Sequence, residues 1–494
     1  MIWGDGWLPL AVLVTPLVFA LPVVWARDRV RRALWVSGSA ITLVFALMLA
    51  RRVVLAGPIE TLGAQIRADG LAAVMSVLIA FLALVCSVYA LDYLPGTHPH
   101  EPQRRERLAR RMPMFTALFL VLESTLFWVA MTNNIVLLWV ALEATTLASV
   151  MLVSFYWDAR ALEAGYKYLL LLTVGITSAF FGCVLLYASA APHLGNESAL
   201  LISNLRRVAD RLPSHLALAS ALLLLIGFGT KAGLAPFHPW VADAHAEAPA
   251  VMSAFLSSVI IKVPFIGMLR VWSVLGPRYP ELNQVLLMLG IFTMVVGAAL
   301  AIAQDDLKRL HAYSSVSQVG YIAAALGLGT PFGFYAAVFF IVSHALTKGL
   351  LFLSTGAVVF SAHEIRSLSA LGGLRRRMPI TAACTLVGAL SLAGMPPFSG
   401  FFAKMQVVLA AADARAWLVL GVAVATSLVT MAYMTSMVQR VFASAPRSAE
   451  LEAADVHEVP ASMRLAMVLL AGAVIVLGLM PQCLDSLLRL VPEM

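Results

Sequence analysis

The sequence predicts an all-α protein that crosses a membrane many times. Of its 494 residues, 61% are hydrophobic and only 12% are charged, whereas soluble domains carry about a quarter charged residues. Apolar stretches of roughly 18 to 25 residues recur along the chain, and each is long enough to span a bilayer as a helix. Because the connections between them are short, we expect a single integral membrane domain over residues 1–494.

About fourteen such stretches are expected to form transmembrane helices. Their centres lie near residues 16, 42, 82, 122, 145, 178, 225, 262, 293, 320, 347, 395, 428 and 473. We expect them to group as N-terminal helices over about 1–112, a first repeat over about 113–275, a second repeat over about 280–441 and a C-terminal helix over about 461–487.

The basic residues predict how the chain is oriented in the membrane. They are concentrated in four of the odd-numbered loops, namely Arg27 to Arg32, Arg104 to Arg111, Arg366 to Arg377 and Arg440 to Arg447. Because cytoplasmic loops carry an excess of Lys and Arg, both termini are expected on the non-cytoplasmic side. These loops also explain the net charge of +8, so the charge gives no reason to expect a nucleic-acid partner.

Cysteine usage gives no indication of a cofactor. The four cysteines lie singly in or beside apolar stretches, at Cys86, Cys183, Cys384 and Cys483. No CxxC motif occurs, so disulfide, iron–sulfur and zinc sites are not favoured. The run ADAHAEAPAV contains Asp243, His245 and Glu247, but we expect it to be a short connection between helices, and we expect neither a metal nor another cofactor in this chain.

The lysines are distributed differently from the arginines. The chain has six lysines and 28 arginines, and the arginines lie in loops or at the ends of apolar stretches. Four lysines fall inside apolar stretches, namely Lys231, Lys262, Lys348 and Lys404. Lys167 lies at the start of one, and Lys308 lies in a plainly polar connection. A lysine at mid-membrane costs about 2.5 to 3.5 kcal/mol, so four unpaired lysines would cost on the order of 10 kcal/mol.

This cost favours a functional role, because lysine, unlike arginine, can release its proton when it is desolvated. Carboxylates that could pair with the lysines are Glu143 and Glu123, both within apolar stretches. Glu163 precedes Lys167, and His344 precedes Lys348, at the i,i+4 spacing of one helix face. The alternative is that the lysines snorkel or form static ion pairs between helices.

Two pairs of segments resemble each other in the same order. KAGLAPFHPW (231–240) aligns with LAGMPPFSGF (392–401), and EAGYKYLLLLTVG (163–175) aligns with HALTKGLLFLSTG (344–356). The paired segments are separated by an odd number of predicted spans, so the second five-helix repeat is expected to be inverted relative to the first. Each repeat contains a helix broken by Gly and Pro, with Lys231 or Lys404 beside the break. Inverted repeats with broken helices are typical of ion-coupled transporters.

Five longer motifs carry a resemblance to a known family. They are TNNIVLLWVALEATTL, FGTKAGLAPFHPWVADAHAEAPAVMSAFLSSVIIK, DDLKRLHAYSSVSQVGY, SHALTKGLLF and LAGMPPFSGFFAK. The chain resembles the antiporter-like subunits of respiratory complex I, of hydrogenase-4 and formate hydrogenlyase, and of the Mrp sodium/proton antiporters. The resemblance covers nearly the whole chain, most specifically residues 130–410, and looks closest to the F component of hydrogenase-4.

The resemblance implies a line of charged residues at mid-membrane. By motif position these are the fifth-helix carboxylate Glu143, the broken seventh-helix Lys231, the eighth-helix Lys262, the eleventh-helix pair His344 and Lys348, and the broken twelfth-helix Lys404. Glu163 and Lys167 are possible accessory residues. Glu123 is a third, although it is not part of the family pattern.

The implied function is proton translocation by a membrane subunit that has no redox centre and catalyses no covalent reaction by itself. Glu143 near Lys231 would favour the protonated lysine, and its withdrawal would send the proton along the line to Lys404. Other membrane subunits of a complex I-like or hydrogenase complex are the expected partners, in a bacterial inner membrane. The main alternative is an Mrp-type sodium/proton antiporter subunit. A solute carrier or a passive scaffold is less favoured, because no substrate-sized polar cluster occurs and the buried lysines are costly.

Overall fold

The computed structural model describes residues 6–97, 101–445, 448, 451–452 and 455–488. Arg447, the last residue of the fourth basic loop, lies outside the described residues. In this part of the chain the fold is almost entirely helical, and the only sheet is an antiparallel pair of short strands, β1 (Ile59–Thr61) and β2 (Ile66–Ala68). The predicted all-α membrane class is therefore confirmed.

The helices follow one another along the chain with short connections. The α-helices are α1 (Trp7–Trp25), α2 (Asp28–Ala56), α3 (Gly70–Gly96), α4 (Pro102–Met131), α5 (Ile135–Val153), α6 (Ala159–Leu194), α7 (Ile202–Leu205), α8 (Ser214–Ala232), α9 (Pro239–Glu247), α10 (Ala250–Phe255), α11 (Val263–Leu275), α12 (Pro280–Ile302), α13 (Leu307–Gly327), α14 (Pro331–Ser361), α15 (Pro379–Ala393), α16 (Ser399–Asp413), α17 (Trp417–Val438), α19 (Ala461–Leu479) and α20 (Asp485–Leu488). The 3-10 and π segments are η1 (Ser198–Leu200), η2 (Ala209–Arg211), η3 (Leu256–Ile260), η4 (Gln439–Ala443) and η5 (Pro481–Leu484).

Twelve helices in the described part of the chain are long and apolar enough to span a membrane. Two of the expected fourteen are not among them. The stretch near residue 320 forms α13, whose first turns carry Lys308, Arg309 and His311. The stretch near residue 395 is divided into α15 and α16, with 15 residues each.

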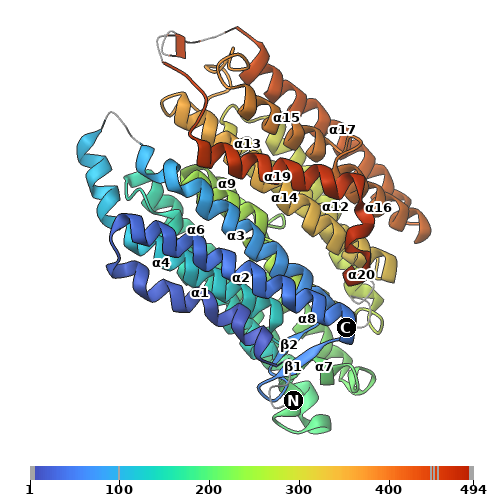
Figure 1. Ribbon diagram of the computed structural model, residues 1–494. Coiled ribbons are helices and arrows are strands. Elements are labelled where there is room, and N and C mark those ends of the chain that lie inside the picture. Colours follow the sequence, from blue (N-terminus) through green and yellow to red (C-terminus); the bar gives the residue numbers. More distant parts are fainter. Residues whose placement is uncertain (1–5, 98–100, 446–447, 449–450, 453–454, 489–494) are drawn as a thin grey trace.

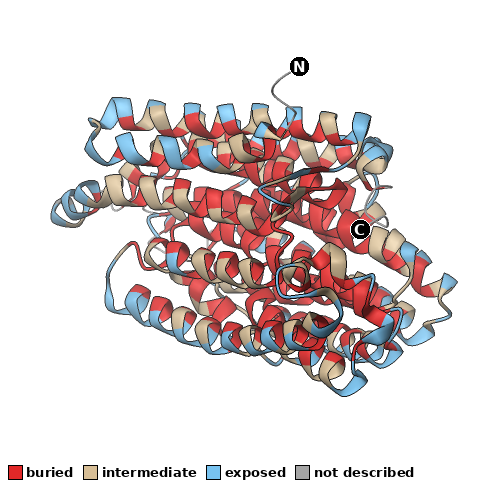
Figure 2. Ribbon diagram, turned by 90° about the horizontal axis from the view of Figure 1, so that it is seen from below, coloured by how far each residue is buried: buried red, intermediate tan, exposed pale blue. Residues whose placement is uncertain are grey.

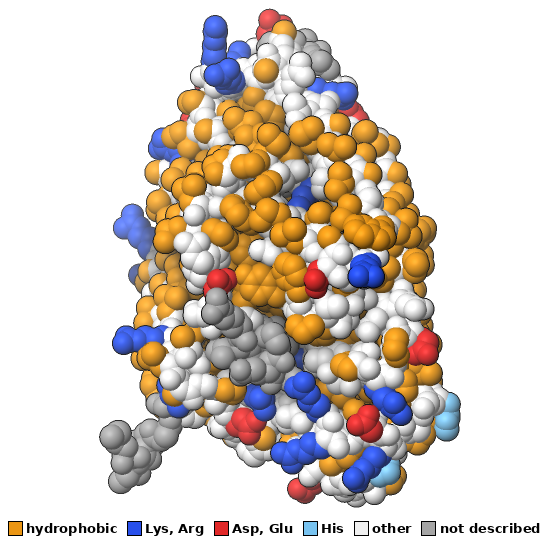
Figure 3. All heavy atoms as spheres, turned by 90° about the vertical axis from the view of Figure 1, so that its right-hand side faces the viewer, with side chains coloured by type: hydrophobic (Ala, Val, Ile, Leu, Met, Phe, Trp, Pro, Cys, Tyr) orange, Lys and Arg blue, Asp and Glu red, His pale blue; other side chains and the backbone are white. Residues whose placement is uncertain are grey.

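The helices form a bundle with polar ends and an apolar circumference. In Figure 1 the start of α1 and helix α20 lie at the same end of the bundle. Buried residues fill the interior, whereas the outermost helices keep an exposed face (Figure 2). Large apolar side chains lie on these faces, such as Leu21 and Val174, which are 66% and 70% exposed. Figure 3 shows such side chains covering the upper and central part of one face, as a lipid-facing surface requires.

Two stretches form the centre of the bundle. The apolar part of the α10–η3–α11 stretch (Ala250–Leu275) and that of α14 are completely buried. They carry Lys262, His344 and Lys348, so these three predicted site residues are in the most enclosed part of the molecule.

The helix breaks are located where Gly and Pro predicted them. Helix α8 ends before Gly233 (φ 73°), and α15 ends before Gly394 (φ 86°). Both glycines are left-handed, a conformation that glycine adopts at no steric cost. The bonds Ala235–Pro236 and Pro396–Pro397 are cis.

A third break was not predicted. Between α10 and α11 the chain forms the π segment η3, and Lys262 precedes the first residue of α11. Pro264 lies at the second position of α11, where its missing N–H costs no hydrogen bond. Residue Pro264 was therefore the available sequence signal for a helix restart.

Two expectations about connections were wrong. The run ADAHAEAPAV was expected to be a loop, but residues up to Glu247 form α9. Lys308 was expected in a polar connection, but it lies in α13 and is only 6% exposed. Its polar neighbours Asp305 and Asp306 made the segment look exposed, whereas packing against α9 buries the lysine.

Candidate functional site

Lys231 lies in the last turn of α8, directly before the break, and is fully buried. Its ammonium group donates hydrogen bonds to the carbonyl oxygen of Leu142 and to the hydroxyl of Thr146, the latter at 2.5 Å. Both acceptors belong to α5. The charge is thus solvated by neutral dipoles of a neighbouring helix, which a buried charge requires.

Glu143 lies on the same helix α5 but turns toward α6. It is half-buried, and its Oε1 atom accepts from the Thr173 hydroxyl at 3.4 Å. No ion pair between Glu143 and Lys231 occurs among the described residues, and the two side chains have different hydrogen-bond partners. In this conformation the Leu142 carbonyl and the Thr146 hydroxyl hold the lysine.

Lys262 is bonded to the π segment that precedes it. Its ammonium group donates to the carbonyl oxygen of Ser257. The wider π turn shifts the hydrogen bond of Ile261 N–H to Leu256 O, which offers the Ser257 carbonyl to the lysine. The Ser257 hydroxyl in turn lies 2.8 Å from the hydroxyl of Ser315 on α13.

Lys348 meets this chain of hydrogen bonds from the other side. Its Nζ atom donates to the carbonyl oxygen of His311 at 2.8 Å and to the Ser314 hydroxyl. The same His311 carbonyl accepts from the Ser315 hydroxyl at 2.9 Å. Polar groups of Ser257 on η3 and of His311, Ser314 and Ser315 on α13 therefore lie between Lys262 and Lys348.

His344 and Lys404 line the same small cavity. His344 precedes Lys348 by one helical turn, and neither of its ring nitrogens has a hydrogen-bond partner among the described residues. A cavity of about 10 Å³ between α14, α15 and α16 is lined by both His344 and Lys404, and also by Thr347 and Ser391. This is about the space that one water molecule needs.

Lys404 uses a carbonyl group that the helix break leaves without an intrahelical donor. Its Nζ atom lies 3.4 Å from the carbonyl oxygen of Ala393, the last residue of α15. The last carbonyls of a helix have no intrahelical donor and need other partners. The ammonium group also lies 5.3 Å from the centre of the Tyr321 ring, within the range of a cation–π interaction.

The accessory residues lie outside this line. Lys167 is 46% exposed and pairs with Glu163 at 2.7 Å, as its spacing predicted, and with Asp243 at 3.2 Å. Glu123 is fully enclosed between other helices, where its Oε2 atom accepts from the Ser39 hydroxyl at 3.3 Å.

The carboxylates of Asp243 and Glu247 are engaged in ion pairs. Asp243 pairs with Arg309 at 2.5 Å, and Glu247 pairs with Arg366 at 3.0 Å. No group of three metal-ligating side chains occurs in the described ranges.

Three buried groups of the site were missed by the sequence interpretation, namely His245, Lys308 and His311. His245 and His311 both lie against the Phe352 ring, with ring centres 4.8 and 5.7 Å from it. Within the described structure, all four ring nitrogens of these histidines lack hydrogen-bond partners. Lys308 and His311 belong to the motif DDLKRLHAYSS, so their i,i+3 spacing on one helix face was a usable signal.

Comparison with known proteins identifies the family. Residues 132–430 match the family model described as "NADH:quinone oxidoreductase/Mrp antiporter, TM". The chain belongs to this family. It is an antiporter-like membrane protein, as the sequence motifs predicted.

Relatives of several kinds are similar to this chain. Subunit N of NADH-quinone oxidoreductase from Desulforudis audaxviator is 34% identical over 84% of this chain and 82% of the relative. A hydrogenase-4 component F homolog from Methylacidiphilum infernorum is 36% identical over 60% of this chain and 63% of the relative. A chain of the Mrp complex from Dietzia sp. has the same fold, with a TM-score of 0.87 at 22% identity, over 99% of this chain and 97% of that one.

Proposed function

We propose that this chain translocates protons as a membrane subunit of a multisubunit energy-converting complex related to NADH:quinone oxidoreductase or hydrogenase-4. The observation that carries the proposal is the line of buried titratable groups. It runs from Lys231 on α8 through Lys262, Lys348 and His344 to Lys404 on α16. Hydroxyl groups of η3 and α13 lie between Lys262 and Lys348 in its middle. Such groups are costly in a membrane and mark proton pathways.

The proposed cycle begins at Glu143 and Lys231. While the Glu143 carboxylate is within electrostatic reach, it stabilises the ammonium form of Lys231. When the carboxylate is withdrawn, only the dipoles of Leu142 and Thr146 remain, and the buried charge becomes costly. The proton then passes to Lys262, crosses the α13 hydroxyls to Lys348 and His344, and reaches Lys404.

The full topology is part of the proposal. Helix α13 and the α15–α16 pair would complete fourteen crossings, and residues 113–275 and 280–441 would form two inverted repeats. The left-handed glycines at both breaks support this equivalence. Both termini would lie on the non-cytoplasmic side of a bacterial inner membrane, because the basic loops belong on the cytoplasmic side.

Other membrane subunits are the proposed partners, and electron transfer is assigned to them. The similar proteins named above include a subunit of NADH-quinone oxidoreductase and a component of hydrogenase-4. To drive the cycle, a conformational change in such neighbours would have to change the interaction free energy between Glu143 and Lys231 by a few kcal/mol.

Substitution of Lys231 tests the proposal. We expect Lys231→Ala to lower proton translocation at least ten-fold in vesicles that contain the intact complex, measured with an internal pH-sensitive dye. Lys231→Arg should fail equally, because arginine keeps the charge but cannot release the proton. Arg415→Ala, at an exposed basic residue outside the line, is the control and should retain transport. If the Lys231→Arg variant translocates protons at the full wild-type rate, Lys231 does not carry protons.

An Mrp-type sodium/proton antiporter subunit is the second candidate, and the family description itself includes these antiporters. The two candidates differ in the coupled ion. Uptake of radioactive sodium that depends on an opposing proton gradient, and that disappears in Lys231→Ala, would favour the antiporter.

A further inference from the structure

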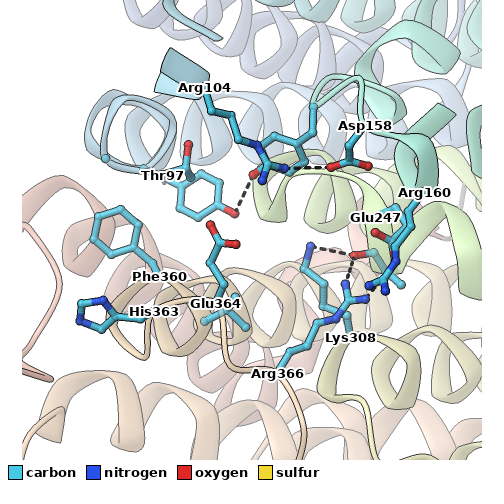
Figure 4. Close-up of a pocket in the computed structure, with 15 residues that line it drawn as sticks. Thr97, Arg104, Asp158, Arg160, Glu247, Lys308, Phe360, His363, Glu364 and Arg366 are labelled. Atoms are coloured by element: carbon cyan, nitrogen blue, oxygen red, sulfur yellow. Dashed lines mark hydrogen bonds and ion pairs between the residues drawn. The ribbon is translucent and has the colours of Figure 1, made fainter. Parts of the chain in front are cut away.

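Two polar cavities lie at opposite ends of the bundle, since helix α3 begins beside one and ends beside the other. The larger, of about 290 Å³, holds four Lys or Arg side chains and three carboxylates in its described lining. Figure 4 shows these charges facing one another, and Arg104 pairs there with Asp158 at 2.8 Å. The smaller cavity, of about 140 Å³, lies at the start of α3, and its charges are not balanced in this way.

Three arginines line the smaller cavity, which we call the arginine cavity. They are Arg67 of β2, Arg206 directly after α7 and Arg270 of α11. Asp69, which caps α3, carries the one carboxylate among the described lining residues. The strands and α7 lie at the end of the bundle where α1 starts (Figure 1). The positive-inside bias disfavours basic residues at this end, so membrane orientation does not explain the three arginines.

Arg270 is held rigidly in the wall of the arginine cavity. Its side chain is only 4% exposed, and it donates to the carbonyl oxygens of Ala130 at 2.8 Å and Thr132 at 3.0 Å. Its Nη2 atom lies 3.4 Å from Oδ2 of Asp69, and the Nε atom of Arg67 lies 4.0 Å from the same oxygen. One carboxylate is therefore shared by two guanidinium groups, and the Nε–H of Arg270 has no acceptor among the described residues.

This arrangement leaves a positive charge in a largely buried place. The other oxygen of Asp69, Oδ1, accepts from the backbone N–H of Ala72 at 2.9 Å, so the carboxylate also serves the first turn of α3. A buried charge is costly unless it is paired and hydrogen-bonded. A second anion in the arginine cavity would complete the pairing of Arg67 and Arg270.

An additional donor faces the same cavity from α7. The Ser203 hydroxyl accepts from the side-chain amide of Asn133 at 2.9 Å, and the Ser203 backbone N–H donates to the Asn133 carbonyl oxygen at 3.1 Å. No acceptor for the hydroxyl hydrogen of Ser203 occurs in the part of the chain that the structure describes. Arg206 also lines the cavity and is exposed, which puts a flexible cation at its mouth.

We propose that the arginine cavity binds a phosphate group, supplied either by the headgroup of an anionic phospholipid or by inorganic phosphate. The guanidinium group matches the geometry of phosphate oxygens and forms charge-assisted hydrogen bonds with them. The volume of about 140 Å³ is roughly ten times what one water molecule needs. The bound group would join β2, α7 and α11. This inference does not depend on proton translocation, so its failure would leave the proposed function untouched.

Arg206→Ala tests the site, because it removes the cation at the mouth and leaves the contacts of the buried Arg270 in place. We expect phosphate-group binding to weaken about ten-fold, as loss of one charge-assisted hydrogen bond implies. Arg207→Ala is the matched control, since Arg207 is the neighbouring exposed arginine and does not line the cavity. Without ligand, both variants should melt at the wild-type temperature.

Binding is measured with the delipidated full-length protein in neutral detergent, by native mass spectrometry for lipid and by calorimetry for inorganic phosphate. The lipid probe is dioleoyl phosphatidylglycerol, and dioleoylglycerol, which has the same tails without phosphate, is its control. Binding of phosphatidylglycerol alone assigns the site to a lipid headgroup, whereas binding of inorganic phosphate that also displaces the lipid assigns it to a free anion.

Three results overturn the inference. They are equal binding by wild type and Arg206→Ala, equal losses in Arg206→Ala and Arg207→Ala, and binding of dioleoylglycerol as strong as that of phosphatidylglycerol. The second would show a diffuse effect of surface charge, and the third would show that only the tails are recognised. If Arg206→Ala does not fold, Ser203→Ala decides, because it removes one hydroxyl donor and no charge. Unchanged binding of both probes by Ser203→Ala would then overturn the inference.

Discussion

At the scale of single residues, substitutions of Lys404 can distinguish a role in carrying protons from a role in packing. Its ammonium group is held by one carbonyl oxygen at 3.4 Å and faces the cavity that it shares with His344. If protons leave the line at this position, translocation requires a titratable side chain here, whether its charged form is positive or negative. We therefore expect Lys404→Glu to keep measurable translocation. Its pH dependence should shift to lower pH, because a carboxyl group releases its proton at lower pH than an ammonium group.

Lys404→Met is the matched control for this prediction, since methionine fills the space but binds no proton. It should lose translocation across the whole pH series, measured by proton uptake into vesicles. If the Lys404→Met variant transports protons as well as the wild-type protein does, residue 404 contributes only packing. Protons then leave the line elsewhere.

At the scale of elements, glycines set the distance between helices α12 and α13. A Cβ atom on Gly297 would lie 2.2 Å from the backbone nitrogen of Ser317, and one on Gly320 would lie 2.5 Å from that of Met294. Such close approach of backbones is how membrane helices associate without a hydrophobic driving force. Gly297→Ala should therefore force the helices apart and destabilise the protein by about 1–3 kcal/mol.

The measurement is the thermal unfolding of the detergent-solubilised protein. Gly421→Ala on α17 is the control, because nothing lies within 4 Å of a Cβ atom there. Gly421→Ala should melt at the wild-type temperature or slightly above it, because alanine favours the helix. Equal melting temperatures for the two variants would show that α12 and α13 can separate without cost.

The breaks also show which elements the sequence could predict. The interruptions after α8 and α15 were predictable, because Gly and Pro act locally on the backbone. The π segment before Lys262 was not, since the stretch LSSVIIK contains no residue that breaks a helix by itself, and Pro264 after it indicates only where α11 restarts. The burial of Lys308 also escaped prediction, because it depends on α9 packing over α13 rather than on the neighbouring residues.

The same reasoning applies to the site. Lys231, Lys262, Lys348 and Lys404 could be selected because a lysine in an apolar stretch is costly wherever it lies. His245 and His311 could not be selected with the same argument, since a histidine in a helix can be exposed, paired or unpaired. Only the three-dimensional arrangement shows that their ring nitrogens are buried without partners among the described residues.

At the scale of the whole molecule, an exposed native cysteine, Cys483, allows the orientation in the membrane to be measured. The positive-inside bias predicts that both termini lie opposite the basic loops, and the start of α1 and helix α20 lie at one end of the bundle (Figure 1). Cys483 lies in η5, directly before α20, and is exposed, whereas Cys86, Cys183 and Cys384 are buried. A membrane-impermeant maleimide should therefore react at this one position and from one side.

We expect maleimide to label wild-type protein in right-side-out vesicles within minutes and to leave it unlabelled in sealed inside-out vesicles. Cys483→Ser should abolish the signal in both, which shows that the buried cysteines do not contribute. Arg440→Cys in that background places a thiol at an exposed position of η4, at the start of the fourth basic segment, and should give the opposite pattern. Labelling of Cys483 in inside-out vesicles instead would put the termini in the cytoplasm.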